Sequence, residues 1–501
     1  MSTVDTEKSA TGPLDRWFEI TRRGSNPGRE VRGGLVTFLA MAYIIALNPL
    51  IIGTAPDKDG NLISGQPYLD ASGEVIGANV GTSIAMVAAA TALIAGVMTL
   101  LMGVVARYPL GIAAGLGLNA LLAYVIAPQM TWPQAMGLVV WEGIIIALLV
   151  LTGFRTAVFR AVPPTLRTAI AVGIGLFITF VGLINAGIVR KPAGSSVPVE
   201  FGISGSLIGW PMLVFVIGLL LVTVLYARNV KGALLISVIV ATALAAIIEA
   251  VRKIGPMAPD GTNPTGWSLN VPATDSVIAL PDFTLLGRVD MFGAFSQENV
   301  TAIGIAMLIF ALLLADFFDT MGTVVAVGAE GDLLDKEGNP PHLGSILMVD
   351  SLSAAAGGLG SVSSNTAYVE SASGVAAGAR TGIASVITGI GFLLAIFFSP
   401  LVNIVPSEAV APVLVFVGFL MMSQVTSINW DELEDALPAF LTIVMMPFAY
   451  SITVGIGAGF ILYVVLKVVR GKASKVHPLM YVVAILFVFY FVQGVFSPLL
   501  S

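Results

Sequence analysis

The stretch ALLLADFFDTMGT, residues 311–323, places Asp316 and Asp319 inside an apolar run that has no other charge between Glu298 and Glu330. An ionised side chain near the centre of a bilayer costs at least about 2.5 to 3.5 kcal/mol, so such residues usually face a partner or a water-filled cavity. At a spacing of three, both acids lie on one face of a helix. We therefore expect a functional site on this helix; the alternative is that one acid caps a helix end.

The composition extends this membrane interpretation to the whole chain. Of the 501 residues, 56% are hydrophobic and 11% are charged, whereas soluble domains carry about 25% charged residues. Runs of about 20 apolar residues recur from Gly33 to Leu499, and helices are the economical way for such runs to satisfy their backbone in lipid. The sequence predicts an all-α polytopic membrane protein.

Several classes of site are disfavoured by what the sequence lacks. It has no cysteine and only two histidines, His342 and His477, both in polar connections, so thiolate or histidine metal centres are not expected. The net charge of -6 is spread through loops and suggests no nucleic-acid partner. Residues 1–31 contain no cleavable signal peptide that we recognise. We expect no catalytic residue, metal or cofactor.

The apolar runs divide into two halves around a polar connection at about residues 251–299, and we expect seven spans in each. The first seven cover about residues 33–52, 82–105, 108–124, 136–152, 169–188, 210–226 and 232–250. The second seven cover about 300–327, 343–359, 361–382, 383–398, 409–422 and two helices within 439–469, split near Ser451, with the acidic residues 431–438 in a connection. Because seven is odd, the second half would be an inverted repeat of the first. Whether the extra apolar piece 478–496 spans or lies on the membrane stays open.

Basic residues predict the orientation of these spans. Arginines precede the first span and follow the fourth, and a lysine- and arginine-rich cluster begins at the end of the fourteenth: Arg16, Arg22, Arg23, Arg29, Arg155, Arg160, Arg167, Lys467, Arg470, Lys472 and Lys475. By the positive-inside rule these segments are cytoplasmic. We therefore expect a multi-pass protein of the cell (cytoplasmic or inner) membrane with its N-terminus in the cytoplasm.

The third segment of each half is a poor uninterrupted helix. Residues 108–124 contain three glycines and a single amide, Asn119, and residues 361–382 are rich in small side chains around one acid, Glu370. Matched interrupted segments in two halves of a transporter indicate its binding site. We expect Asn119 and Glu370 to meet the acids of residues 311–323.

The residues of this expected site favour a flat heterocycle. Carboxylates accept from ring N–H groups, an amide both donates and accepts, and freed backbone N–H groups donate to carbonyl oxygens. A nucleobase satisfies all of them, whereas an inorganic anion would meet acids and no nearby base except Arg380, which fits better as a charge at the membrane border. Desolvation and mutual repulsion favour protonation of at least one acid among Asp316, Asp319 and Glu370, which could then couple transport to a proton.

Structural roles compete with these assignments. Asn119 could bond a neighbouring helix backbone, and Glu370 could cap a half-helix. Phe317, Phe318 and Tyr368 fit packing better than ring stacking. The glycines of residues 374–382 lack the ending of a phosphate-binding loop. An intramembrane aspartyl protease would need its two acids on different helices.

Five stretches resemble one family. GGLVTFLAMAYIIALNP (33–49), AAGLGLNALLAY (113–124), LLADFFDTMGT (313–323), TAYVESASGVAAGARTG (366–382) and FLTIVMMPFAYSITVGIGAGF (440–460) are spread over nearly the whole chain. Together they resemble the nucleobase/cation symporter-2 superfamily, in its azaguanine-like branch of hypoxanthine, guanine and adenine permeases. The resemblance also favours purines over the uracil and ascorbate branches, which look different around residue 316.

The resemblance implies a fold of fourteen transmembrane segments in two inverted seven-helix repeats, with core and gate domains. It also implies short strands in the third and tenth segments, and residues 478–496 look like the tail of this branch. The implied units are a cytoplasmic tail (1–31), core first half (32–167), gate first half (168–251), extracellular connection (252–298), core second half (299–400), gate second half (401–470) and C-terminal segment (471–501).

By position, the resemblance implies substrate binding by Asn119, Asp316 and Glu370. Asp319 matches a second acid that serves transport and coupling, so the proton-coupling candidates are Asp319, Asp316 and Glu370. The implied function is import of purine nucleobases by proton symport, with a sodium-coupled or anion transporter of the same fold as the alternative. The sequence leaves open the preferred base, the coupling ion and whether the protein works as a homodimer.

Overall fold

The fold is taken from a computed structural model. It describes residues 12–152, 161–191, 197–258, 262–273, 278–296, 301–335 and 339–500, with side chains up to residue 492. The expected cytoplasmic arginines Arg155 and Arg160 lie outside the described residues, as do the first 11 residues of the expected tail.

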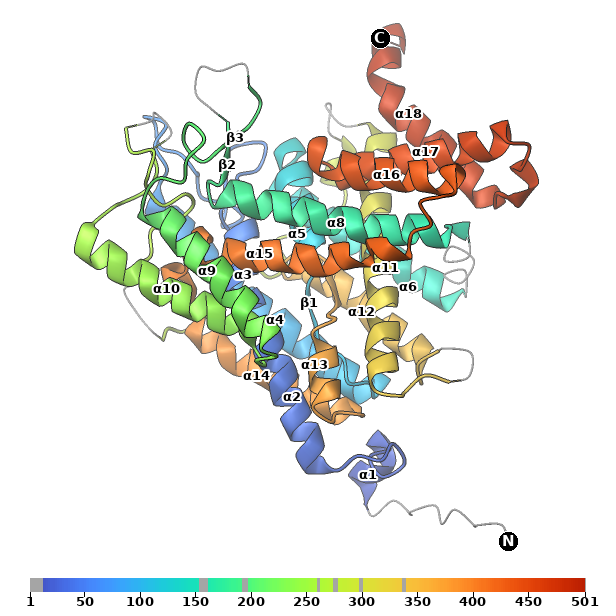
Figure 1. The fold of residues 1–501 in the computed structure, drawn as a ribbon, viewed down its shortest axis with the longest axis horizontal. Coiled ribbons are helices and arrows are strands. Elements are labelled where there is room, and N and C mark those ends of the chain that lie inside the picture. Colours follow the sequence, from blue (N-terminus) through green and yellow to red (C-terminus); the bar gives the residue numbers. More distant parts are fainter. Residues whose placement is uncertain are drawn as a thin grey trace.

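Helices dominate the described chain (Figure 1). The long ones are α2 (Pro27–Met41), α3 (Ile44–Ile52), α4 (Gly77–Leu101), α6 (Trp132–Leu151), α8 (Pro164–Asn185), α9 (Trp210–Ala227), α10 (Ala233–Arg252), α11 (Ala302–Glu330), α12 (Leu343–Leu359), α14 (Gly382–Ala395), α15 (Ser407–Met422), α16 (Leu433–Phe448), α17 (Ile452–Val469) and α18 (Pro478–Leu500). Three are short: α1 (Pro13–Phe18), α5 (Leu116–Leu121) and α13 (Ser371–Ala376). Single π turns cover Met102–Ala106 and Leu122–Ile126, and 3-10 turns cover Ala127–Gln129, Gly293–Ser296, Ile396–Ile404, Ser423–Ser427 and Ala473–Lys475.

Within the described ranges, ten helical stretches are long and apolar enough to cross a membrane, with mean hydropathies from 1.9 to 2.6. Three further apolar helices are shorter: Leu116–Gln129, Leu343–Leu359 and Pro478–Val492. Spanning helices of this kind need about 20 apolar residues. The chain is therefore a multi-pass membrane protein, and its mostly helical class is as predicted.

The two interrupted segments each contain a short strand followed by a short helix. Strand β1 (Ile112–Ala114) precedes α5, and β4 (Asn365–Ala367) precedes α13. The strands pair antiparallel, with Ala113 opposite Thr366, so segments about 250 residues apart meet in the middle of the molecule. A second pair, β2 (Val189–Arg190) and β3 (Glu200–Phe201), lies in a loop.

Small polar side chains satisfy the backbone where the first interrupted segment is extended. The N–H of Leu110 donates to the Ser385 hydroxyl (2.8 Å), that of Gly111 to the Ser371 hydroxyl (2.9 Å), and that of Ile112 to Thr99 Oγ1 (3.0 Å). Backbone groups inside a bilayer must find partners within the protein. This explains how non-helical chain is tolerated in the buried interior of the protein.

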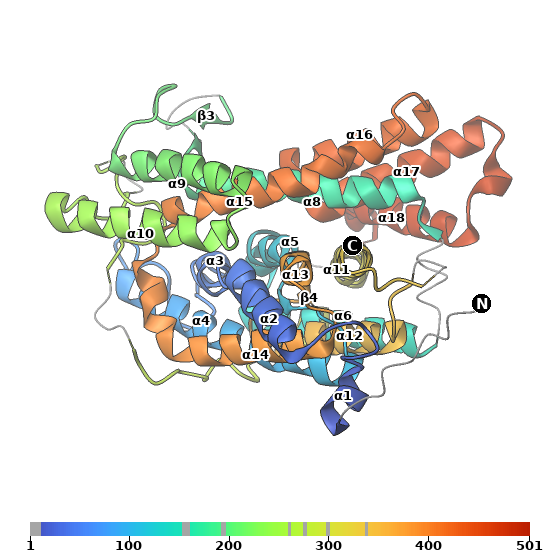
Figure 2. The ribbon, with the colours of Figure 1, turned by 60° about the horizontal axis from the view of Figure 1, so that its bottom comes forward.

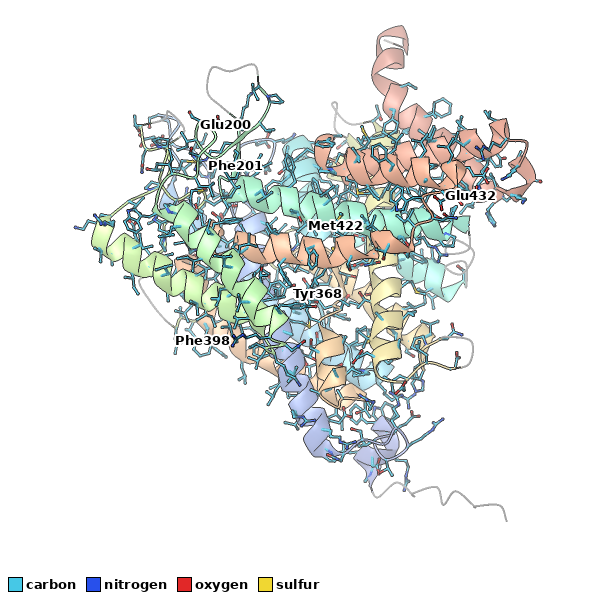
Figure 3. The ribbon with its side chains drawn as sticks, in the orientation of Figure 1. Glu200, Phe201, Tyr368, Phe398, Met422 and Glu432 are labelled. Atoms are coloured by element: carbon cyan, nitrogen blue, oxygen red, sulfur yellow. The ribbon has the colours of Figure 1, made fainter. Side chains whose placement is uncertain are left out.

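The helices form two packed groups (Figure 2). In one, α2, α3, α4, α6, α11, α12, α13 and α14 contact one another; in the other, α8, α9, α10, α15, α16 and α17 do. Helix α5 contacts both α3 and α8, and α18 packs on α17 and α11. The interrupted segments thus lie close to the boundary between the groups, and Tyr368, just after β4, is near the centre of the molecule (Figure 3).

The long apolar run at 439–469 is split as predicted, because Ser451 caps α17 by accepting from the N–H of Val454 (3.3 Å). The prediction that residues 431–438 form a connection is wrong for most of that stretch, since α16 begins at Leu433. Acids in a first turn are stabilised by the helix dipole, and Glu434 also pairs with Lys467 (2.9 Å). The acidic composition marked a helix start rather than a loop.

Candidate functional site

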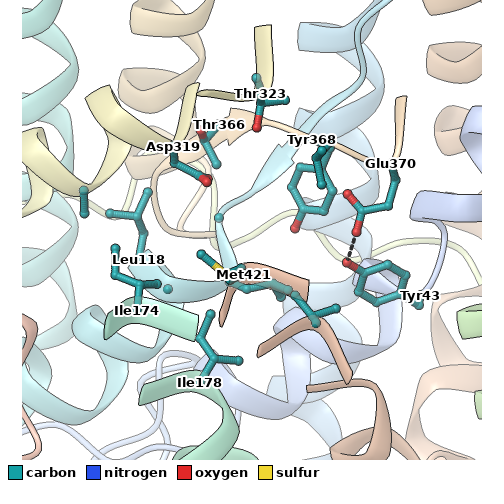
Figure 4. A pocket seen from close by; sticks show the side chains of 17 residues that line it. Tyr43, Leu118, Ile174, Ile178, Asp319, Thr323, Thr366, Tyr368, Glu370 and Met421 are labelled. Atoms are coloured by element: carbon teal, nitrogen blue, oxygen red, sulfur yellow. Dashed lines mark hydrogen bonds between the residues drawn. The ribbon is translucent and has the colours of Figure 1, made fainter. Parts of the chain in front are cut away.

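A pocket opens between the two helix groups at the level of the paired strands (Figure 4). One side is lined from α11, α5, β4 and the residues that follow β4, and the other side from α8 and α15. It holds about 570 Å³ of empty space, a volume that includes open solvent at its mouth. The pocket is therefore bounded by elements that belong to different packed groups.

The polar side of the pocket carries two acids. Asp319 comes from the middle of α11 and Glu370 from the N-cap position of α13. Tyr43, completely buried just before α3, donates its hydroxyl to Glu370 Oε1 at 2.7 Å. Tyr368 also lines the pocket, and its hydroxyl donates to the Ala114 carbonyl at 2.5 Å. The Tyr43 hydroxyl thus orients one oxygen of Glu370, and the backbone of β1 fixes the Tyr368 hydroxyl.

The opposite side is apolar. It consists of side chains from α8 and α15, namely Ile174, Ile178, Val417 and Met421. The start of α5, residues 116–118, closes a third side, and the first N–H groups of any helix have no acceptor within that helix. A flat ring could lie against the aliphatic side chains while its edge meets carboxylates and backbone donors.

The structure brings two of the four predicted site residues to this pocket. Asp319 and Glu370 line it, whereas Asn119 and Asp316 are not among its lining residues and are fully buried. Asp316 lies one turn before Asp319 on α11. The amide of Asn119 lies on α5, directly after lining residues 116–118, and neither its oxygen nor its nitrogen has a hydrogen-bond partner among the described residues.

Several residues that line the pocket were not predicted from the sequence as part of the site. Among them are Tyr43, Thr323, Thr366 and the aliphatic side chains of α8 and α15. Tyr368, for which packing was preferred, lines the pocket, whereas Phe317 and Phe318 do not. A tyrosine hydroxyl in an apolar stretch is the one signal that could have indicated Tyr43, because a buried phenol usually finds a polar partner.

Basic side chains are absent from the described lining of the pocket. Arg380 instead donates to the carbonyls of Val375 (2.6 Å) and Ala379 (2.7 Å) after α13, and its N–H donates to Glu30 Oε1 (2.9 Å). Across the described ranges, no group of three or more histidine, aspartate or glutamate side chains is arranged to hold a metal ion.

Known proteins resemble this chain over nearly its full length. The model of the permease family Xan_ur_permease matches residues 73–458. The chain is 38% identical to the guanine/hypoxanthine permease PbuG of Bacillus subtilis (strain 168), covering 96% of this chain and 99% of that protein. It is 35% identical to the adenine permease AdeP of Escherichia coli (strain K12), covering 96% and 97%.

Solved structures share the fold at low identity. The transmembrane domain of the cyanobacterial bicarbonate transporter BicA aligns with a TM-score of 0.57 and 15% identity, over 86% of this chain and 96% of that chain. The murine anion transporter Slc26a9 in its inward-facing state aligns with a TM-score of 0.57 and 11% identity, over 89% and 69%. Because the family model spans most of the chain and the curated relatives match end to end, this chain belongs to the xanthine/uracil permease family and is a membrane transport protein, not an enzyme.

Proposed function

We propose that this protein imports purine nucleobases, among them hypoxanthine, guanine and adenine, by proton symport across the cell membrane. The carrying observation is a pocket between two helix groups that offers two carboxylates on one side and aliphatic side chains on the other. The names of relatives at 35% and 38% identity, an adenine permease and a guanine/hypoxanthine permease, support the purine class.

In this proposal, the pocket acids receive the edge of the base. Glu370 and Asp319 accept ring or exocyclic N–H groups, and backbone N–H groups at the start of α5 donate to ring acceptors. Asn119, whose amide has no hydrogen-bond partner among the described residues, and Asp316 complete the binding site after a small shift of α5 or α11. Protonation of one of Asp316, Asp319 and Glu370 before the base binds couples the transport of the base to the movement of a proton.

Transport requires the site to open alternately to the two sides. We propose that the chain forms fourteen segments in two inverted repeats, and that a core domain (32–167 and 299–400) moves against a gate domain (168–251 and 401–470), with the N-terminus in the cytoplasm. The division of the helices into two packed groups and the place of the pocket between them support this arrangement. In transporters of this kind, one bundle rocks against another around a fixed midplane site.

An anion substrate is the weaker alternative, although BicA and Slc26a9, which share the fold, are described as bicarbonate and anion transporters. An anion would meet Asp319 and Glu370 without a compensating lysine or arginine in the described lining, and like charges repel strongly in a medium of low dielectric constant. A sodium gradient in place of a pH gradient tests the other alternative, sodium coupling.

The test is uptake of labelled hypoxanthine into cells lacking their own purine permeases, at two external pH values. We expect saturable uptake that rises at acidic pH and is lost in Glu370→Gln. The matched control is Glu74→Gln, because Glu74 is an exposed acid in a loop, and it should behave like the wild type. Wild-type protein that reaches the membrane but transports no purine would refute the substrate class; uptake driven only by sodium would refute proton coupling.

A further inference from the structure

Glu142 and Asp350 are two of the acids that lie buried in helices outside the pocket. Glu142 on α6 and Asp350 on α12 are both 0% exposed, and α6 and α12 pack closely against each other. Asp350 acts electrostatically on Glu142 and also on Asp319 of the pocket. Neither Glu142 nor Asp350 lines the pocket, so the binding of a base does not account for them.

One oxygen of this pair lacks a partner. Glu142 Oε1 accepts from the Ser364 hydroxyl at 3.2 Å, but Glu142 Oε2, although buried, has no hydrogen-bond partner among the described residues. An unpaired carboxylate oxygen is costly in a low-dielectric interior, and two neighbouring buried carboxyl groups do not both ionise readily. The group that relieves both problems without a new side chain is a proton.

Two threonine hydroxyls connect Asp350 to the pocket. Thr320 Oγ1 donates to Asp350 Oδ1 at 2.8 Å, and Thr320 Oγ1 and Thr366 Oγ1 are hydrogen-bonded at 2.8 Å. Thr366 lines the pocket and interacts with the Asp319 carboxyl beside it (Figure 4). All these side chains except Asp319 are at most 1% exposed. A continuous row of exchangeable groups therefore runs from the pocket to the buried pair.

A hydroxyl can accept one hydrogen bond while it donates another. We propose that Glu142 and Asp350 form a proton-binding site that exchanges one proton with Asp319 through Thr366 and Thr320. The inference rests on the proposed proton symport. In one transfer, the Asp319 carboxyl loses its proton to Thr366, Thr366 passes its own hydroxyl proton to Thr320, and Thr320 passes its proton to Asp350. One O–H bond is lost at Asp319 and one is formed at Asp350, and both threonines end neutral.

This site gives the carrier a place for the coupled proton that the substrate does not occupy. Asp319 can be ionised to receive an N–H group of the base while the proton stays inside the same helix group. The coupled proton is then held as a neutral, buried carboxylic acid outside the pocket. Base transport would then be coupled to proton movement through the link between Asp319 and Asp350. The group that holds the proton would not compete with the base for the pocket.

A purely structural role makes a different prediction. Asp350 would then serve only as the acceptor for Thr320, a task that the Oδ1 atom of an asparagine fulfils equally well. Asp350→Asn keeps that acceptor but cannot bind and release a proton. Thr320→Val removes the hydroxyl link at nearly the same volume, and Thr320→Ser restores the hydroxyl.

The experiment uses the full chain in proteoliposomes and two assays. Exchange of labelled hypoxanthine for unlabelled hypoxanthine at equal pH needs no net proton movement, whereas accumulation under an imposed pH difference does. With one proton per base, a difference of about one pH unit supports about tenfold accumulation. We expect that accumulation for the wild type and Thr320→Ser, and almost none for Asp350→Asn and Thr320→Val, which continue to exchange.

The control is Ser351→Ala, because Ser351 neighbours Asp350 on α12 but its hydroxyl donates to the backbone carbonyl of Leu347 in the same helix (2.7 Å). It should accumulate hypoxanthine like the wild type. Wild-type-like accumulation by Asp350→Asn overturns the inference, and so does parallel loss of exchange and accumulation in Asp350→Asn while Thr320→Val remains normal. Wild-type exchange without any response to the pH difference instead refutes the proposed proton symport, so the two failures are distinguishable.

Discussion

At the scale of single residues, the hydroxyl of Tyr43 orients the carboxylate of Glu370 in the pocket. Its hydroxyl donates to Glu370 Oε1 at 2.7 Å although the two residues are 327 positions apart, and the tyrosine is fully buried. A buried hydrogen bond to a charged group contributes about 1.5 to 3 kcal/mol. The contact therefore orients the Glu370 carboxylate through Oε1.

Tyr43→Phe tests this contact. We expect the apparent KM for hypoxanthine to rise about tenfold, because a loss of about 1.4 kcal/mol changes an equilibrium constant by that factor, with a smaller effect on the maximal rate. Initial rates of labelled uptake over a range of concentrations measure both. The control is Tyr481→Phe, whose hydroxyl bonds the Ala473 carbonyl (2.9 Å) far from the pocket lining. An unchanged KM in Tyr43→Phe would refute the positioning role.

At the scale of elements, the place of Glu370 depends on how closely α13 approaches α2. A Cβ atom at Gly374 would lie 2.5 Å from the Gly33 carbonyl oxygen and would also clash with Thr37 Oγ1. Small residues permit such close helix contacts in membranes. Gly374→Ala should push α13 from α2, displace Glu370 and reduce uptake severalfold, as judged from initial rates normalised to membrane expression.

Gly322→Ala is the matched control for that change. Gly322 lies in α11, and a Cβ atom there would have no neighbour within 4 Å. Alanine also has a higher helix propensity than glycine, by about 1 kcal/mol. The variant should transport normally and resist heating at least as well as the wild type. Equal behaviour of the two alanine variants would show that the α2–α13 contact does not position the site.

At the scale of the whole molecule, transport by relative motion requires α5 to move against α8. A Cβ atom at Gly117 of α5 would lie 3.8 Å from the Cβ of Ile174 on α8, within the range of about 3.5 to 4.5 Å that a disulfide needs. The chain contains no cysteine. A Gly117→Cys, Ile174→Cys double variant therefore offers a single engineered bridge on a background without other thiols.

We expect the oxidised double variant to lose uptake and to recover it on reduction, while each single variant responds to neither treatment. Mass spectrometry of the linked peptides confirms the bridge. Full transport by a completely bridged protein would contradict relative movement of the two helix groups at this boundary. The conformational change would then have to occur in another part of the protein.

The sequence by itself determined the properties that depend on local composition. Apolar runs indicated a multi-pass helical protein, and glycine-rich segments marked where helices break, because glycine disfavours a helix. The serine at 451 marked a helix start through its capping side chain. The motifs also indicated the family. These features can be predicted without knowledge of tertiary contacts, because each depends on residues that are close in the sequence.

The tertiary structure decided which side chains face the pocket. Helix α11 is buried on nearly all sides, so its sequence has no polar face that would separate Asp319, which lines the pocket, from Asp316, which does not. The approach of Tyr43 to Glu370 and the link from Thr320 to Asp350 join separate segments. The rotation and packing of whole helices set such contacts, and no local pattern records them.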